Sequence, residues 1–492
     1  MKQLRLYIRR IGLILCALFV LLILYSVYSL SNYGSRWFST SANTWLRSAK
    51  KDVIPGDVYD VNGILLAGSA VADTPTGFTA VRKYPDSADL RRAMVHVLGD
   101  SAGKVSNGVE TFMARALYGF NQGMPERIRD FVSGARRKGD SLTLTVDSKL
   151  CTYILNCVES LPDASGKGES PRGAVVVMNW KTGAVLAEMS FPTFDPADAA
   201  AARQIAGDPY TNRATQGLYA PGATFKVVTA AAVLTDPQLS GRSFTCTGSY
   251  QAADSEGQTL QISDAETSEG EVPLVAHGQI DLRRAFRLNC STTFAAAAVQ
   301  LTDAKLRRQA MTFGFDENFL FRDIVLENSS YPDQDRSVWA LALTGVGQGG
   351  LQATPMHLCL IASAVANGGV MMEPRLVARS TASSGAVRRN FTSQTIRKLF
   401  DDPAVADTLR EYMDDAVNAE GGTAREAALT GWRVCGQAAG AGGQGSDALF
   451  IGFLDDEQAP YAISIVLEDR PGGNEAASLA HDIFEYLILY IR

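Results

Sequence analysis

The chain of 492 residues is poor in the residue types that build metal sites. It has four scattered histidines, and its seven cysteines follow no spacing typical of metal ligands. We therefore expect no metal site and no other cofactor. Most cysteines should be small core residues, although a disulfide pair stays open. The cysteines are Cys16, Cys151, Cys157, Cys246, Cys290, Cys359 and Cys435.

The chain also lacks an excess of basic residues. Its net charge is −6 at neutral pH. Residues 1–30 hold four basic residues and no acidic one, so the rest of the chain is more acidic than this total. An acidic body disfavours a nucleic-acid partner, and we expect none. The hydrophobic content of 46% is that of a globular protein with a sizeable core, and the length fits two or three domains.

Residues 11–30 form an apolar run of roughly the 20 residues that a membrane-spanning helix needs. Four basic residues precede this run and none follows it before Arg36. The positive-inside rule therefore places residues 1–10 in the cytoplasm, as a short tail, and the body outside. A cleaved signal peptide is the alternative, but no clear small-residue cleavage site follows the run. We expect an uncleaved single-pass anchor, with a juxtamembrane linker at residues 31–50.

Residues 51–141 carry no obvious chemistry. Apolar residues alternate through residues 55–67 on both sides of Asn62-Gly63, a pattern that predicts a β-hairpin with a tight turn. We expect this region to be a β-rich pedestal that serves as a spacer and a docking surface.

Residues 142–492 have the pattern of a mixed α/β domain. Apolar runs typical of strands occur near both of its ends, with helical patterns between them. Asp147 or Ser148 is placed to cap a helix that runs to about residue 161. The C-terminal strands should complete a sheet that the N-terminal strands begin. The predicted strands are residues 142–147, 173–178, 184–190, 448–454 and 461–468, and the closing amphipathic helix is residues 475–491.

An apolar helix predicted at residues 224–233 organises this domain. Pro221 and Gly222 form a turn before it. Its residues are apolar on nearly every side, so it should be buried. Ala223 and Lys226 are three positions apart and should therefore point into the same space.

This stretch resembles the active-site helix of the penicillin-binding proteins, serine acyltransferases whose first motif is Ser-x-x-Lys. The hairpin at residues 55–67 is similar to the opening signature of the class B members, although Pro55 and Val61 replace both signature arginines. The resemblance extends over residues 52–492. It implies a transpeptidase-like (β-lactamase-like) fold behind the pedestal, D,D-transpeptidase activity in peptidoglycan synthesis, and attachment to the bacterial cytoplasmic membrane.

The resemblance also assigns the positions that carry the family's chemistry. A serine attacks an acyl carbonyl, and a buried lysine takes its proton. A second serine and an asparagine relay protons, and a Lys-Thr-Gly strand holds the substrate carboxylate and lines the oxyanion site. The equivalent positions in this chain are Ala223, Lys226, Asn289, Ser291, Gln437, Ala438 and Ala439.

Most of these positions have lost the chemical group that the family uses. Ala223 cannot attack a carbonyl, and Asn289 and Ser291 are in swapped order. Residues 437–439 carry neither the positive charge nor the hydroxyl of Lys-Thr-Gly. We therefore expect the fold to be kept and the chemistry to be lost, with an empty or repurposed cleft and no catalytic residue.

Two hydroxyl groups and one amine leave alternatives open. Thr224 adjoins Ala223, but one step along a helix turns a side chain by roughly 100°. Ser291 is a conceivable substitute nucleophile if Lys226 lies near it. Lys226 itself either reaches solvent or keeps a role in binding.

Three functions are compatible with this pattern. The first is a membrane-anchored pseudo-transpeptidase, a scaffold or regulator among cell-wall synthesis proteins. The resemblance implies a polytopic glycosyltransferase as the partner, reached through the anchor and the pedestal. The second is a transpeptidase that uses an unorthodox nucleophile such as Ser291. The third is a non-covalent sensor of peptidoglycan stem peptides or β-lactams, for which Gln437 in place of lysine predicts weak binding.

Overall fold

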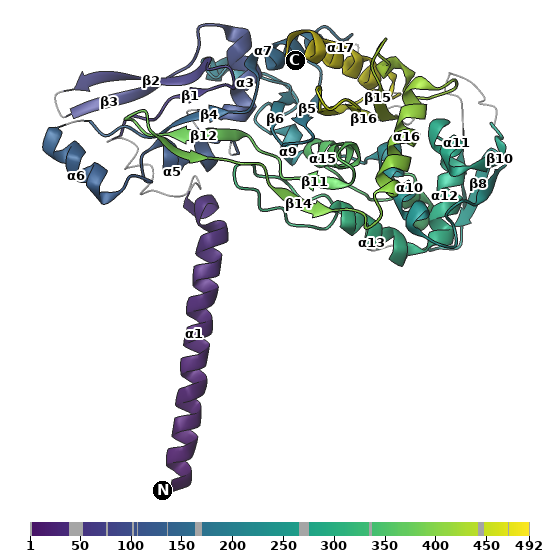
Figure 1. The fold of residues 1–492 in the computed structure, drawn as a ribbon, viewed down its shortest axis with the longest axis horizontal. Helices are drawn as coiled ribbons and strands as arrows, with labels where there is room; N and C mark the ends of the chain where they lie inside the picture. Colours follow the sequence, from purple (N-terminus) through teal and green to yellow (C-terminus); the bar gives the residue numbers. More distant parts are fainter. Residues whose placement is uncertain are drawn as a thin grey trace.

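The computed structural model has one long N-terminal helix and a body that contains the other described elements (Figure 1). The helix stands away from the body, and the C-terminus lies on the body (Figure 1). The structure describes residues 2–38, 53–74, 77–100, 103–105, 107–134, 136–162, 170–264, 275–333, 337–440, 447–470 and 472–491.

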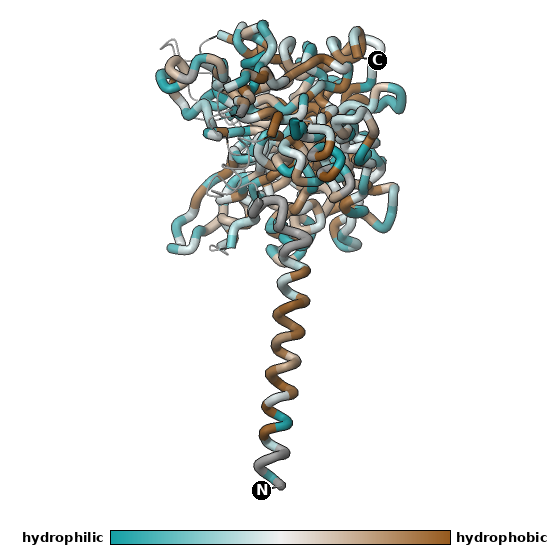
Figure 2. Tube along the Cα trace, turned by 90° about the vertical axis from the view of Figure 1, so that its left-hand side faces the viewer, coloured by the Kyte–Doolittle hydropathy of each residue, from teal (hydrophilic) through white to brown (hydrophobic). Residues whose placement is uncertain are grey.

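Helix α1 (Lys2–Phe38) contains the stretch Tyr7–Ser29, which is long and apolar enough to cross a membrane and is not covered by the body. Figure 2 shows the brown, apolar part of this helix outside the body. The helix fits the predicted anchor at residues 11–30. Residues 31–38 of the predicted linker continue this helix and contain no proline that would end it. Residues 39–50 lie outside the described part of the chain.

The first sheet has six strands in the order β13-β12-β4-β1-β2-β3. The predicted hairpin is confirmed, since β1 and β2 pair antiparallel and Gly63 of the turn has a φ of 82°. Strand β4 pairs in parallel with β1 and antiparallel with β12, so segments far apart in the sequence share this sheet. Its strands are β1 (Val58–Tyr59), β2 (Leu65–Thr74), β3 (Gly77–Lys83), β4 (Ser141–Leu144), β12 (Val377–Thr381) and β13 (Val387–Asn390).

The second sheet has five strands in the order β15-β16-β17-β5-β6, and all neighbours are antiparallel. The C-terminal strands therefore complete a sheet begun by β5 and β6, as predicted. The strand predicted at residues 142–147 does not join it, because this segment is β4 of the first sheet and ends at Leu144. Three of these strands, β15 to β17, are buried along their whole length, which makes this sheet the centre of the core. Its strands are β5 (Gly173–Asn179), β6 (Val185–Phe191), β15 (Val434–Ala439), β16 (Ala448–Leu454) and β17 (Tyr461–Leu467).

Helices pack on both faces of the second sheet, which gives the mixed α/β fold that the sequence predicts. Helices α7 (Ser148–Glu159) and α17 (Asn474–Tyr490) lie together on one face, and α15 (Pro355–Ala366) lies on the other (Figure 1). Asp147 caps α7 by accepting hydrogen bonds from the N–H groups of Lys149 and Leu150, which confirms the predicted cap.

A helical region beside the β15 edge contains the stretch that resembles the family's first motif. It begins with the 3₁₀ turn η2 (Gly222–Phe225) and helix α10 (Lys226–Thr235). The other helices of the body are α3 (Ala88–Leu98), α4 (Val109–Phe112), α5 (Ala114–Leu117), α6 (Met124–Ser133), α8 (Ala199–Ala202), α9 (Arg213–Gln216), α11 (Leu282–Arg287), α12 (Ser291–Leu301), α13 (Asp303–Phe313), α14 (Val338–Gly345), α16 (Ala404–Asn418) and η3 (Arg425–Ala427). The short paired strands are β7 (Ser243–Cys246) with β10 (Gly278–Asp281), β8 (Ser249–Ala253) with β9 (Thr259–Ser263), and β11 (Val370–Met372) with β14 (Thr395–Lys398).

Candidate functional site

The helix predicted at residues 224–233 is present, but its first turn is wound more tightly as η2. In a 3₁₀ turn, side chains three positions apart eclipse each other. This winding keeps Ala223 and Lys226 on one side of the turn. Every residue from Lys226 to Val233 is buried, as its apolar sequence predicts.

The side chain of Lys226 lies in the core, with 1% of its surface exposed. Its Nζ donates to the backbone oxygen of Asn289 at 2.7 Å, to Asn289 Oδ1 at 2.6 Å and to Ser291 Oγ at 3.1 Å. These three acceptors match the three protons of a lysine ammonium. The alternative that Lys226 reaches solvent is therefore wrong, and the positions of the first two motifs meet at this amine.

Burial also changes the acidity of this amine. Loss of hydration lowers the pKa of Lys226 to about 8, although electrostatic interactions with Cys290 and Asp264 oppose the shift. The ammonium and the free amine therefore coexist near pH 8. A lysine in this state can exchange a proton with a neighbouring hydroxyl.

Asn289 holds this arrangement through an unusual backbone conformation. Its φ is 52°, in the left-handed region that asparagine adopts more readily than most residues. In this conformation its backbone oxygen and its side-chain oxygen both accept hydrogen bonds from Lys226. The asparagine that replaces the family's serine therefore suits both the backbone and the lysine.

The third motif lies on β15, the edge strand of the second sheet. Gln437 is fully buried, and its Nε2 is 3.3 Å from Asn289 Oδ1. Its Oε1 has no hydrogen-bond partner in the part of the chain that the structure describes. Ala438 and Ala439 are buried and offer only methyl groups. The strand thus joins the Lys226 site without a cation or a hydroxyl.

The two hydroxyls that could replace the missing serine have different surroundings. The Thr224 hydroxyl is buried and donates to the backbone oxygen of Pro221 at 2.7 Å. Ser291 is half-buried, and its Oγ accepts the hydrogen bond from Lys226. Of these two hydroxyls, Ser291 is the one paired with a base.

Replacing Lys226 with methionine should change how stability depends on pH. The folded pKa of about 8 lies below the usual 10.5, so between these values the unfolded chain binds more protons than the folded one. The wild type should therefore gain stability relative to Lys226→Met as pH rises through this window, by about 3 kcal/mol in full. Urea unfolding of the full chain in detergent at pH 7.5, 8.5 and 9.5 measures the part of this gain that falls below pH 9.5, about 2 kcal/mol.

The matched control for this experiment is Lys398→Met, at an exposed lysine of β14. Parallel pH curves for the wild type and Lys226→Met would show that the buried amine does not titrate in this range.

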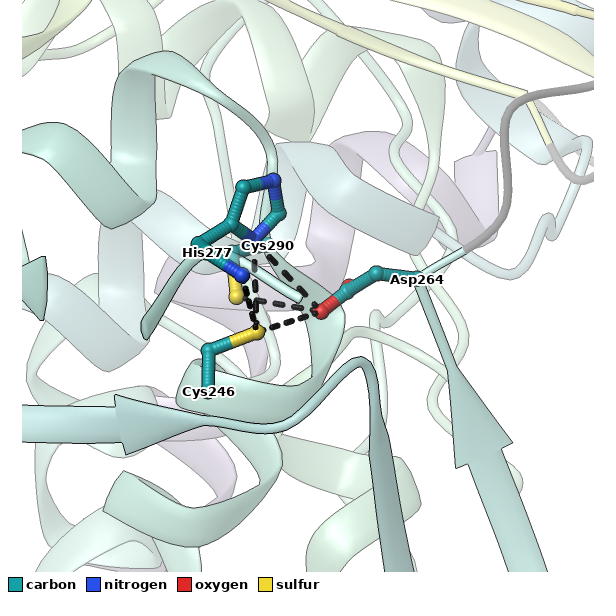
Figure 3. Close-up of side chains that lie close together, drawn as sticks. All are labelled: Cys246, Asp264, His277 and Cys290. Atoms are coloured by element: carbon teal, nitrogen blue, oxygen red, sulfur yellow. Dashed lines mark hydrogen bonds and ion pairs between the residues drawn. The ribbon is translucent and has the colours of Figure 1, made fainter. Parts of the chain in front are cut away.

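A group of possible metal ligands lies directly behind the second motif, contrary to the expectation from the sequence. Its four donor atoms all lie within 4.8 Å of one another (Figure 3). The spacing rules missed the group because its members come from separate elements, and only the fold brings them together. The four residues are Cys246, Asp264, His277 and Cys290.

Comparison with known proteins agrees with this fold. The penicillin binding protein transpeptidase domain matches residues 173–485. The peptidoglycan D,D-transpeptidase PbpA of Mycolicibacterium smegmatis is 28% identical over 438 residues, which are 85% of this chain and 84% of that protein. The peptidoglycan D,D-transpeptidase MrdA of Acinetobacter baumannii is 26% identical over 386 residues, 72% of this chain and 54% of that protein.

Solved structures of penicillin-binding proteins are also similar to this chain. Penicillin-binding protein A of M. tuberculosis, in an imipenem acyl-enzyme complex, superposes with a TM-score of 0.76 at 26% identity and covers 89% of this chain and 100% of that one. The D,D-transpeptidase domain of a peptidoglycan glycosyltransferase from Eggerthella lenta has a TM-score of 0.70 at 25% identity, with 90% and 100% covered. The chain belongs to the penicillin-binding protein transpeptidase family, as a class B member.

Proposed function

We propose that this chain is a pseudo-transpeptidase, a class B penicillin-binding protein that acts in peptidoglycan synthesis without forming acyl-enzymes. The observation that carries the proposal is the methyl group of Ala223 at the position of the family's nucleophile, beside a lysine that is fully bonded to the second motif. Deleting the nucleophile of a serine acyltransferase lowers turnover by a factor on the order of 10⁶.

The buried third motif supports the same proposal. A substrate carboxylate needs a positive charge or hydrogen-bond donors to replace its hydration. Gln437 offers one amide group, and that group faces Asn289. Ala438 and Ala439 add no donor from their side chains. Weak binding of a β-lactam or stem-peptide carboxylate follows.

The proposed role is that of a scaffold or regulator among cell-wall synthesis proteins. Helix α1 serves as a single-pass anchor in the cytoplasmic membrane, with the N-terminus inside and the body outside. The pedestal of residues 51–141 offers a docking surface beside the transpeptidase-like domain of residues 142–492. The partner class that fits this arrangement is a polytopic glycosyltransferase in the same membrane.

Intact-mass analysis of the full chain in detergent after treatment with penicillin G tests the loss of acylation. The mass should stay unchanged, because no hydroxyl occupies the position of the nucleophile. Penicillin-binding protein A of M. tuberculosis, for which a penicillin G acyl-enzyme structure exists, is the positive control. A stoichiometric adduct on the wild-type chain would overturn the proposal.

The contact of Ser291 with Lys226 favours a second candidate function. A hydroxyl 3.1 Å from an amine whose pKa is about 8 has the pairing that activates a nucleophile. If the wild type is acylated, this candidate requires that Ser291→Ala abolish the adduct and that peptide mapping find it on Ser291. An adduct that survives Ser291→Ala would exclude this candidate.

A further inference from the structure

The four-ligand cluster behind the second motif consists of side chains from four separate places in the fold. Cys246 ends β7, Asp264 follows β9, His277 precedes β10, and Cys290 caps the N-terminus of α12. Strands β7 and β10 pair so that Gly278 is opposite Cys246, which places the neighbouring His277 beside that cysteine. Figure 3 shows the four side chains converging on one point.

Four of the six distances within the cluster lie near those of a small tetrahedron, and all six are within 4.8 Å. Cys246 Sγ is 3.3 Å from His277 Nδ1 and 3.3 Å from Asp264 Oδ2. Asp264 Oδ2 is 3.2 Å from Cys290 Sγ and 3.9 Å from His277 Nδ1. Around a tetrahedral zinc ion with bonds of about 2.0–2.3 Å, neighbouring ligand atoms lie about 3.3–3.8 Å apart. Such an ion would fit between these atoms with small shifts of the side chains.

The chemistry of the donors selects the metal. Two sulfurs, one imidazole nitrogen and one carboxylate oxygen form a set that zinc prefers, whereas magnesium and calcium take oxygen ligands. Cys246, Cys290 and Asp264 are buried, and His277 is half-buried. Four protein ligands leave no position for a substrate, which is the pattern of a structural zinc site.

Hydrogen bonds orient the carboxylate of the cluster, as is usual around metal ligands. The Thr292 hydroxyl donates to Asp264 Oδ2, and it lies 3.1 Å from Cys246 Sγ. Partners of this kind fix the orientation of a ligand and raise the affinity of its site for the metal.

The cluster is also tied to the Lys226 site. Cys290 lies between Asn289 and Ser291, the two residues that accept hydrogen bonds from Lys226. Asp264 Oδ1 accepts a hydrogen bond from the backbone N–H of Ser291 at 2.6 Å. A metal held by Asp264 and Cys290 would therefore fix the backbone of the second motif.

We propose that Cys246, Asp264, His277 and Cys290 bind one Zn²⁺ tetrahedrally, and that this ion holds the second motif against Lys226. The proposal does not depend on the loss of transpeptidase activity. The site is structural, because it joins the β7–β10 pair to the start of α12.

Metal analysis of the full chain tests the site. The protein in detergent is stripped with a chelator, incubated with Zn²⁺ alone and dialysed, and its metal content is measured. About one zinc per chain should remain for the wild type, as for a closed site with four protein ligands. Cys290→Ser and His277→Ala should lose this zinc, and Cys157→Ser, at a half-buried thiol outside the cluster, should keep it.

A spectroscopic measurement keeps the test independent of folding defects in the variants. Co²⁺ added to the stripped wild type should give the intense visible bands of a tetrahedral ion and the sulfur-to-cobalt charge-transfer band of thiolate ligands. The proposal is overturned if the wild type retains no zinc, if His277→Ala and Cys290→Ser retain as much as the wild type, or if thiol titration finds Cys246 and Cys290 joined in a disulfide.

Hydrogen exchange measured by mass spectrometry tests the link to the second motif. The amide of Ser291 should be protected in the zinc-loaded chain and should exchange faster after chelation, because its acceptor is a proposed metal ligand. Unchanged exchange at Ser291 in a chain that does bind zinc would overturn this link.

Discussion

Replacing Gly347 with alanine is expected to lower the free energy of unfolding by about 3 kcal/mol or more. Gly347 has a φ of 85°, and a Cβ built there would lie 1.8 Å from the backbone oxygen of Gly222. The N–H of Gly222 also donates to the backbone oxygen of Gly347 at 2.9 Å. The two backbones are therefore too close for any side chain, and alanine must push η2 away.

Urea unfolding of the full chain in detergent measures this loss. Gly368→Ala is the matched control, because Gly368 has a φ of 61° but a Cβ added to it would meet no described atom within 4 Å. Gly368→Ala should lower the free energy of unfolding only by the backbone strain of an alanine in the left-handed region, about 1–2 kcal/mol. Equal losses for the two variants would show that the contact with Gly222 is not needed to place the turn that carries Ala223.

Local patterns are sufficient to predict much of this fold. The alternation around Asn62-Gly63 predicts the hairpin of β1 and β2, and Asp147 is the cap of α7. Each of these features depends on residues that are close in the sequence. The pairing of β12 with β4 depends instead on segments that are far apart in the sequence, and nothing in either segment predicts the other as its partner. That part of the first sheet could be seen only in the folded chain.

The candidate site, too, could be predicted from the sequence only in part. The motif spacing predicts that Ala223 and Lys226 share one side of a buried helix. It does not predict the surroundings of Lys226, because the sequence does not reveal that Asn289 supplies two acceptors from a left-handed backbone. The ligand cluster escapes prediction for a related reason. Spacing rules find ligands on one loop or helix, whereas Cys246 and His277 meet only through the pairing of β7 with β10.

Restoring the family's residues at six positions is expected to restore acylation by penicillin. The exchanges are Ala223→Ser, Asn289→Ser, Ser291→Asn, Gln437→Lys, Ala438→Thr and Ala439→Gly. With a serine at position 223 beside Lys226, and a lysine on β15 for the carboxylate, the acylation rate should rise over the wild type by a factor of up to roughly 10⁶. Fluorescent penicillin and intact mass, followed over time in detergent, measure the rate.

Two partial variants separate the contributions of the motifs. The variant with Ala223→Ser alone should be acylated far more slowly than the variant with all six exchanges, because residues 437–439 still offer no charge or hydroxyl for the substrate carboxylate. The fivefold variant that keeps Ala223 should form no adduct, which makes it the matched control for the nucleophile. Asn289→Ser places serine at a φ of 52°, so the unfolding free energy of each variant must be measured alongside.

The outcome decides what the altered residues mean for this protein. If the sixfold variant is acylated and Ala223→Ser alone is nearly inert, the chain has kept a working scaffold and lost its chemistry at all three motifs. If Ala223→Ser alone is as fast as the sixfold variant, the changes at the second and third motifs do not limit acylation. If the folded variant with all six exchanges stays unlabelled, the scaffold around the three motifs has itself diverged, because the chemical groups that the family uses would then be present without effect.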